Sequence, residues 1–381
     1  MKPFVFSLVF VLYISCKQEK KLNFPVETIE NKVSVKHAKG FSIEKSASDI
    51  TIVKITSPWP NAEASFVYAL VPKEKLSFIT LNKNEYDAII SVPVEKLVVT
   101  STTHIPALES LGQLDKLVGF PKTELISSKA ARKQIDNGAI KELGNNEIIN
   151  TEVVLNLHPD VVIGFGVNAQ NKAYETLQRS NIPVVYNGDW TEESPLGKAE
   201  WIKFFAPFFQ QEVKADSIFN AIETSYKSTK KLAENAKTRP TVLTGGLYKD
   251  VWHVAGGKSW MAQFLEDAKA DYLWGNTTET GGIAVSLETV LNRAKTADFW
   301  LNPSMLTTYE DMMQSNRHYS QFDAFQTKKV YSNTIAQGAT GGLLFYELAP
   351  QRPDLVLKDL IHIFHPTLLP EHELLFFKPL E

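Results

Sequence analysis

The chain has 381 residues, of which 44% are hydrophobic and 22% are charged, and its formal net charge at pH 7 is −3. This length exceeds what one hydrophobic core usually organises, so two lobes or domains are expected. The composition is ordinary for a globular protein. The slightly acidic balance offers no basic surface for a nucleic-acid backbone, so no nucleic-acid partner is expected.

The N-terminal segment predicts export. Lys2 precedes an apolar run over residues 4–14, and Ser15 and Cys16 follow it. About eleven apolar residues are too few to span a bilayer, which needs roughly 20, but they suit a signal peptide over residues 1–15. A signal peptide that ends on a lone cysteine resembles that of a bacterial lipoprotein, which implies lipidation of Cys16 and a place in the periplasm, anchored by lipid alone. A plain signal peptide with a chance cysteine is the alternative.

The next two segments differ in composition. Residues 16–40 are polar and lysine-rich and are expected to form a tether between the lipidated cysteine and the folded part. Residues 41–94 contain β-branched and aromatic runs such as "ITIVKIT" and "SFVYALV", which "SPWPNAE" separates. This pattern predicts a small β-rich extension. The sequence suggests no chemistry for it.

From residue 95 onward, short apolar strands alternate with helices of about ten residues, which predicts parallel α/β sheets. We expect a first lobe over residues 95–194 and a second over 239–346. The linker between them, residues 195–238, contains apolar side chains at helical spacing over 211–236, which predicts a helix of about 39 Å. The tail, residues 347–381, is expected to pack on a lobe. The predicted fold class is therefore α/β, with two Rossmann-like lobes joined by a single long helix and a ligand cleft between them.

A short phrase, Glu-x-Val-Leu-Asn, occurs twice, beginning at Glu152 and at Glu288. In both copies an apolar strand follows shortly after an aspartate, which is Asp160 or Asp298. Each lobe thus carries one copy in the same place, on a helix just before a core strand. Both glutamates are expected in a first helical turn, where negative charge complements the helix dipole.

Several segments resemble the substrate-binding proteins of bacterial ABC importers for ferric siderophores, cobalamin and haem. They are "EKLVVTSTTHIPALESLG", "INTEVVLNLHPDVVIGF", "WHVAGGKSWMAQFLEDAKADYLW", "VSLETVLNRAKTADFWLN" and "RPDLVLKDLIHIFHP", within residues 93–365. The resemblance implies a monomeric, non-enzymatic protein without a cofactor of its own, which captures an iron complex or corrinoid and delivers it to a permease dimer. In that family one surface glutamate of each lobe docks onto permease arginines, and Glu152 and Glu288 match those positions.

The ligand site is expected in the cleft, because ligands of α/β lobes bind beyond the carboxyl ends of the strands. The residues predicted to line it follow those strands: Ser101, Thr102, Thr103, His104, Phe165, Asn168, Asp189, Trp190, Tyr248, Trp252, His253, Trp260, Asn302 and Gln337. The aromatic residues suit a large, flat ligand, although tryptophans are also common in cores. His104 and His253 are expected to face each other across the cleft and could ligate iron, but a purely structural role fits equally well.

Other functions fit parts of the sequence. The run Gly164-x-Gly166-x-x-Ala169 follows a predicted strand, and Asp189 lies at the end of the next one, as in a dinucleotide-binding fingerprint. That reading would make the chain an NAD-dependent enzyme, but the intervening helix is short and NAD is scarce outside the cell. A surface protein that sequesters its ligand without a transporter would keep the cleft but not need the paired glutamates. The histidine-rich tail predicts no metal site, because cysteines and clustered aspartates are missing there.

Overall fold

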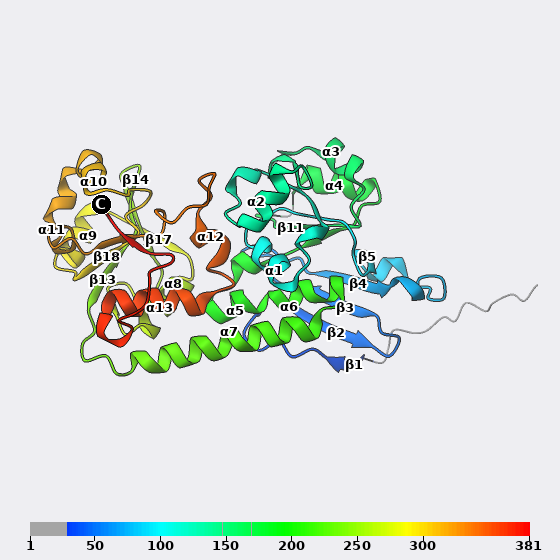
Figure 1. The fold of residues 1–381 in the computed structure, drawn as a ribbon, viewed down its shortest axis with the longest axis horizontal. Helices are drawn as coiled ribbons and strands as arrows, with labels where there is room; N and C mark the ends of the chain where they lie inside the picture. Colours follow the sequence, from blue (N-terminus) through cyan, green and yellow to red (C-terminus); the bar gives the residue numbers. More distant parts are fainter. Residues whose placement is uncertain (1–28, 147, 169) are drawn as a thin grey trace, which may run out of the picture.

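The computed structural model describes residues 29–381 except 147 and 169. The predicted signal peptide, Cys16 and the first part of the tether lie outside the described residues. Figure 1 shows two lobes side by side, a long helix that runs along both, and a small β-sheet against the first lobe. This arrangement confirms the predicted fold class. Within the described residues, no helix is long and apolar enough to cross a membrane.

The extension is a five-stranded sheet in the order β1-β2-β3-β4-β5. Its strands are β1 (Ile29–Lys32), β2 (Phe41–Ser46), β3 (Thr51–Ile55), β4 (Phe66–Pro72) and β5 (Ala88–Val92). The first four pair antiparallel, and β5 runs parallel to β4. Phe41, Val53 and Tyr68 are buried in one core with the first lobe. Residues 29–40, which we predicted as part of the tether, contain β1 and lead into β2, so the extension begins earlier than expected.

The first lobe is built on a parallel sheet in the order β12-β11-β6-β7-β8. Its strands are β6 (Leu97–Val99), β7 (Leu117–Phe120), β8 (Lys141–Glu142), β11 (Val161–Gly164) and β12 (Val184–Tyr186), and its helices are α1 (His104–Leu111), α2 (Lys129–Asp136), α3 (Thr151–Leu157) and α4 (Lys172–Arg179). A hairpin of β9 (Gly144–Asn145) and β10 (Ile148–Ile149) precedes α3. Every residue of β6, β11 and β12 is buried, as expected for strands covered on both faces.

A helical connector joins the lobes. Helices α5 (Pro195–Glu200) and α6 (Ile202–Phe205) lead to α7 (Glu212–Ala233), which has 22 residues and lies within the predicted range 211–236. Phe219 and Ile222 of α7 belong to the core of the first lobe, whereas Tyr226 belongs to the core of the second. One continuous helix of about 33 Å therefore anchors both cores.

The second lobe has a five-stranded sheet in the order β16-β13-β18-β19-β20 and a separate antiparallel sheet in the order β14-β15-β17. Its strands are β13 (Thr241–Thr244), β14 (Gly246–Tyr248), β15 (Val251–Ala255), β16 (Asp271–Tyr272), β17 (Gly282–Val285), β18 (Phe299–Leu301), β19 (Val330–Ser332) and β20 (Lys378–Pro379). Its helices are α8 (Trp260–Asp267), α9 (Leu287–Ala294), α10 (Tyr309–Ser315), α11 (Asp323–Gln326), α12 (Leu344–Leu348) and α13 (Pro353–Phe364). We did not predict the antiparallel sheet.

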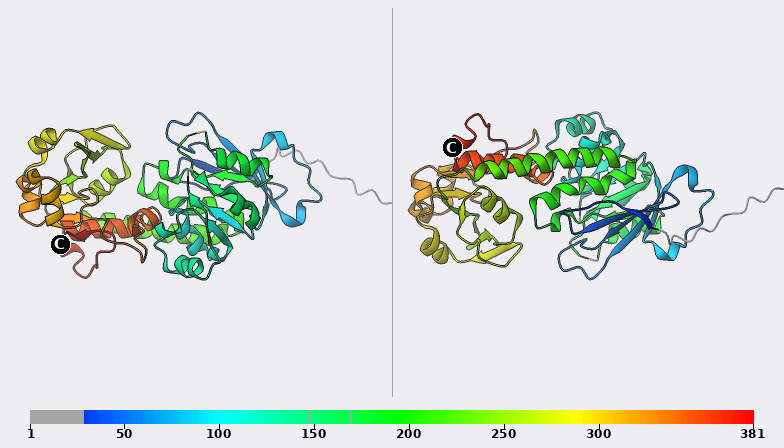
Figure 2. Two further views of the ribbon diagram at one scale, coloured as in Figure 1. Left: turned by 90° about the horizontal axis from the view of Figure 1, so that it is seen from above. Right: turned by 90° about the horizontal axis from the view of Figure 1, so that it is seen from below.

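The C-terminal segment joins the second lobe to the connector. Strand β20 pairs antiparallel with β19 at the edge of the main sheet. Helix α13 packs along α7, as Figure 1 and the right-hand view in Figure 2 show. Leu357, Leu360 and Ile361 of α13 are fully buried in the core of the second lobe.

Candidate ligand site between the lobes

A cavity of about 670 Å³ lies between the two lobes, on the side of the extension. We call it the interlobe pocket. The first lobe contributes Trp190, which follows β12, and the connector contributes Lys198 of α5. The second lobe contributes Trp260 and Met261 of α8. Residues 57–62, which connect β3 to β4, complete the wall. The volume is in the range of small-molecule sites.

Lys198 gives the interlobe pocket a buried positive charge. Its side chain is largely enclosed, and its Nζ donates to the backbone oxygens of Asp189 and Trp190, both at 3.1 Å. The same Nζ lies 5.1 Å from the centroid of the Trp260 ring. Burial lowers the pKa of Lys198. These two bonds occupy two of the three donors of an ammonium group, so the group can also bind a ligand oxygen.

A second cavity of about 870 Å³ adjoins the interlobe pocket, with which it shares Glu193 and Ser259. Charged residues of both signs line it: Lys39, Lys258, Glu266, Asp271 and Arg293. The space between the lobes on this side thus has an aromatic part and an adjoining charged part.

A smaller cavity of about 290 Å³ lies where β13, β18 and β19 of the second lobe end. Tyr248, His253, Asn302 and Tyr346 are among its lining residues, and the side chains of Tyr248 and Tyr346 are 62% and 55% exposed. Phenol oxygen and imidazole nitrogen are donors that bind iron. The edge of the second lobe therefore presents potential iron ligands to a bound molecule.

On the other side of the boundary, residues 336–347 of the second lobe reach over to the first lobe. We call this segment the strap. The backbone N–H groups of Ser127 and Ser128 donate to the Glu347 carboxylate at 2.5 and 2.8 Å. Thr340 Oγ1 donates to the backbone oxygen of Glu124 at 2.7 Å. Burial raises the pKa of Glu347 to about 7. A further cavity of about 680 Å³ lies here, between α2 and the strap.

The structure distributes the predicted ligand residues over several places. Trp190 and Trp260 line the interlobe pocket, Tyr248, His253 and Asn302 line the cavity at the second lobe's edge, and Gln337 lines the cavity beside the strap. Ser101, Thr102, Thr103 and Phe165 are half-buried at the ends of β6 and β11, and Asn168 is exposed. Asp189 is buried beneath Lys198. Two of the predicted residues thus line the interlobe pocket, whereas Lys198 and the loop 57–62, which line it too, were not among the predicted residues.

Two residues that we predicted to line the cleft, Trp252 and His104, are buried in the core instead. Trp252 has no exposed surface: its ring stacks on Trp300 at 5.2 Å, and its Nε1 donates to the oxygen of Thr244, so it belongs to the core. Side chains alternate along β15, which turns Trp252 inward and His253 outward. His104 is also fully buried, against Phe205 at 5.3 Å. It therefore does not face His253 across the cleft, and burial lowers its pKa.

The glycines of the possible dinucleotide fingerprint serve internal packing. A Cβ on Gly164 would lie 2.2 Å from the Tyr174 hydroxyl, and one on Gly166 would lie 3.1 Å from both Trp59 and Tyr186. Ala169, the third position, lies outside the described residues. The space next to the two glycines is filled by aromatic side chains of the protein, whereas a dinucleotide site needs it for the pyrophosphate.

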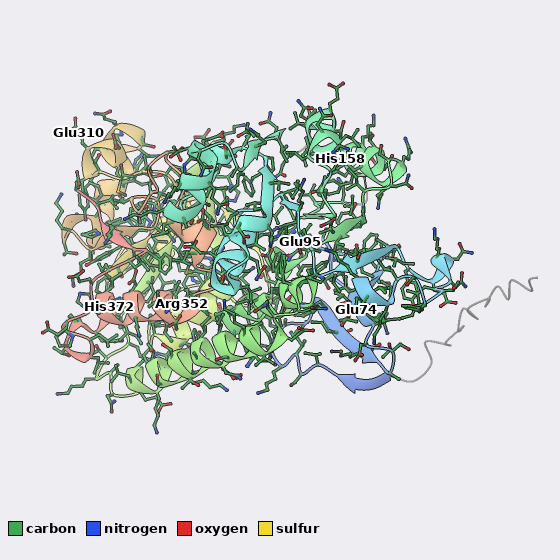
Figure 3. All side chains as sticks on the ribbon, turned by 45° about the vertical axis from the view of Figure 1, so that its right-hand side comes forward. Glu74, Glu95, His158, Glu310, Arg352 and His372 are labelled. Atoms are coloured by element: carbon green, nitrogen blue, oxygen red, sulfur yellow. The ribbon has the colours of Figure 1, made fainter. Side chains whose placement is uncertain are left out.

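The repeated phrase occupies equivalent positions in the two lobes. Glu152 and Glu288 are exposed in the first turns of α3 and α9, whose N-caps are the side chains of Asn150 and Ser286. His158, which is labelled in Figure 3, caps the C-terminus of α3 and is exposed as well.

The aspartate that follows each copy of the repeated phrase has the same structural role. Asp160 Oδ2 accepts from the backbone N–H of Lys96, just before β6, and Asp298 Oδ2 accepts from that of Thr241, at the start of β13. The two lobes are therefore matched in local hydrogen bonding as well as in sequence.

Comparison with known proteins decides the family. A profile of the family described as periplasmic binding protein matches residues 97–334. The chain belongs to the periplasmic binding protein family. Members of this family bind small molecules for ABC importers and are not enzymes. The match begins after β5, so the β-rich extension of this periplasmic binding protein precedes the family's conserved region.

Relatives and solved structures agree with this assignment. An uncharacterized lipoprotein of Methanocaldococcus jannaschii is 24% identical over 298 residues, which are 76% of this chain and 69% of the relative. A possible iron-binding (periplasmic solute-binding) protein from Staphylococcus epidermidis has a TM-score of 0.57 at 16% identity, covering 72% of this chain and 99% of that one. A periplasmic heme binding protein from Pseudomonas aeruginosa has a TM-score of 0.56 at 17% identity, covering 76% and 98%. At such identities the structural likeness establishes the fold alone.

Proposed function

We propose that this periplasmic binding protein captures an iron complex, either a ferric siderophore or haem, or a corrinoid, and delivers it to the permease of an ABC importer. The observation that carries the proposal is the interlobe pocket, into which both lobes place a tryptophan, Trp190 and Trp260. Proteins of similar structure include a possible iron-binding protein, a heme-binding protein and a vitamin B12-binding protein.

The exposed donors of the second lobe support an iron complex. Tyr248 and His253 lie together in the cavity at the carboxyl ends of the strands. A phenolate and an imidazole bind iron directly, whereas a carbohydrate or a peptide would need neither. Within the described residues, no cluster of three or more histidine, cysteine, aspartate or glutamate side chains could hold a bare metal ion.

Export and anchoring follow from the N-terminal sequence. The expected lipidation of Cys16 agrees with the description of the Methanocaldococcus jannaschii relative as a lipoprotein. A lipid anchor would keep a monomeric binding protein close to its permease without a membrane-spanning segment.

Docking on the permease is assigned to Glu152 and Glu288. They are exposed, they occupy equivalent helical positions, and one belongs to each lobe. A permease dimer offers two equivalent surfaces, and arginine–carboxylate pairs are directional. Exposed ion pairs are individually weak, so the two glutamates would set the register of docking more than its affinity.

Ligand binding is tested by thermal unfolding with haemin, cyanocobalamin and ferrioxamine B. A ligand present at 100 times its dissociation constant stabilises the folded protein by about 2.7 kcal/mol, which produces a clear rise of the unfolding temperature. For an iron probe, Tyr248→Phe combined with His253→Ala is expected to weaken binding, while Tyr248→Phe alone retains the ring. A wild-type protein that responds to none of the three probes would refute the proposed ligand class.

Docking is tested by uptake. Glu152→Ala with Glu288→Ala is expected to leave ligand affinity unchanged but to reduce import sharply. The matched control is Glu175→Ala with Glu310→Ala, since these glutamates also lie exposed in first helical turns, one in each lobe. Full uptake by the first double variant would exclude docking through these residues and favour a protein that sequesters its ligand without a transporter.

A further inference from the structure

We propose that residues 57–62 of the β-rich extension, here called the extension loop, form a specificity-determining wall of the ligand site. The inference rests on the proposed function and deepens it: the ligand has a flat, conjugated face and carries an oxygen acceptor. The extension precedes the region that the family profile matches, so this wall is added to the two-lobe fold.

The extension loop lies at the carboxyl ends of the first lobe's strands. The Trp59 ring packs edge-on against Tyr186, the last residue of β12, with centroids 5.5 Å apart. Thr191 Oγ1 donates to the backbone oxygen of Ser57 at 3.1 Å. Ligands of α/β lobes bind at this edge of the sheet, so the loop occupies one flank of the expected site.

Two glycines of the first lobe make this contact possible. A Cβ on Gly188 would lie 2.1 Å from the backbone oxygen of Ser57, and one on Gly166 would lie 3.1 Å from the Trp59 ring. The first distance is shorter than any contact between such atoms, so a side chain at 188 would displace the loop. The extension loop therefore packs closely against the backbone of the first lobe.

Buried carboxylates hold the start of the extension next to the same pocket. Glu192, which lines the interlobe pocket, accepts from the backbone N–H groups of Lys39 and Gly40 at 2.7 and 2.8 Å. Glu200 accepts from the backbone N–H groups of residues 36–38 at 2.6 to 3.0 Å. Glu192 is thus shared between the attachment of the extension and the lining of the pocket.

The composition of the walls indicates the ligand class. Trp59 and Pro60 of the extension loop, Trp190 of the first lobe and Trp260 of the second surround one space. Aromatic rings favour flat conjugated surfaces, against which they stack or pack edge-on. Lys198, at the same wall, supplies a donor for a carboxylate or carbonyl oxygen.

The test is a titration of the full-length protein with haemin, a flat molecule that carries carboxylates. Binding is measured from the change in haemin absorbance. Pro60→Trp places a large side chain at an exposed position of the loop and is expected to weaken haemin binding about tenfold or more, as is Trp190→Ala. Ser77→Trp, at an exposed position elsewhere in the extension, is the matched control and should stay within twofold of wild type.

The outcomes separate this inference from the proposed function. If haemin binds, and Tyr248→Phe with His253→Ala weakens it while Pro60→Trp and Trp190→Ala do not, the extension-loop proposal falls and the proposed function stands. Binding of ferrioxamine B alone also overturns the flat-ligand proposal. If the wild type binds none of the three probes, the proposed function fails and this inference fails with it.

Discussion

The two sides of the boundary between the lobes are built in opposite ways. On the extension side, Trp190 and Trp260 line one open cavity, and a second, charged cavity adjoins it. On the strap side, hydrogen bonds cross the boundary directly, from Ser127 and Ser128 to Glu347. A cavity of about 680 Å³ lies on the strap side as well, but there the two lobes are bonded directly. We call the contacts of Ser127 and Ser128 with Glu347 the seam, and we expect the ligand to enter from the extension side.

The seam is continued by the connector. Gln351 Nε2, next to the strap, donates to Ser110 Oγ of the first lobe at 2.8 Å. Helix α7 contributes residues to both cores, and α13 packs along it. These contacts join the two lobes at several points in addition to those of the strap.

The largest expected effect is on the extension side. Glu200 has no exposed surface, pairs with the buried Lys203 at 3.1 Å and accepts three backbone N–H groups of the extension. Glu200→Gln removes the charge that accepts these N–H groups, while Lys203 keeps its pair with Asp216 at 3.2 Å. The change is therefore expected to cost about 1.5–3 kcal/mol of unfolding free energy. Denaturant unfolding measures the loss, with the exposed Glu193→Gln as control. A loss below about 1 kcal/mol would contradict the role of Glu200 in holding the extension.

A smaller effect is expected at the seam, where the protonation of Glu347 makes the free energy of unfolding depend on pH. The pKa of Glu347 is about 7 in the folded protein against an ordinary 4.5, so the folded state holds this proton more tightly. The resulting stabilisation is complete below about pH 4.5 and is lost as pH rises to about 7. Between pH 6 and 7 the loss amounts to about 1 kcal/mol.

Glu347→Gln isolates this contribution, because a glutamine in the same place does not titrate. Its unfolding free energy, measured at pH 5, 6, 7 and 8, is expected to vary less with pH than that of the wild type. The exposed Glu373→Gln is the control. Parallel pH profiles for wild type and Glu347→Gln would show that the seam carries no titrating carboxylate.

The parts of the fold that sequence predicted depend on local patterns. The spacing of apolar residues over α7, the place of Glu152 in the first turn of α3 and the alternation of strands and helices can all be recognised within short windows. The antiparallel sheet could not be recognised in this way, because β15 pairs with β17 across the whole of α8. Without that sheet the inward side of β15 was unknown, and Trp252 was taken for a ligand residue.

The site was only partly predictable for a related reason. Tyr248, His253 and Trp260 follow predicted strands, so the rule that ligands bind at carboxyl ends led to their prediction, and all three line cavities in the structure. His104 also follows a strand, but Phe205 of the connector covers it, which no local pattern indicates. Trp59 sits in "SPWPNAE", which reads only as a break between strands, and its contact with Tyr186 depends on tertiary packing.

The two glycines beneath the extension loop have a consequence for homologues. Where a related chain retains the loop, we expect position 188 to stay glycine, because the backbone oxygen of Ser57 leaves no room for a Cβ. We expect position 166 to stay small, because a Cβ there would contact the Trp59 ring tightly. In chains without the extension this restriction does not apply, and larger residues can occur at positions 166 and 188. We therefore expect glycine at both positions to accompany the extension loop in those family members that share this third wall.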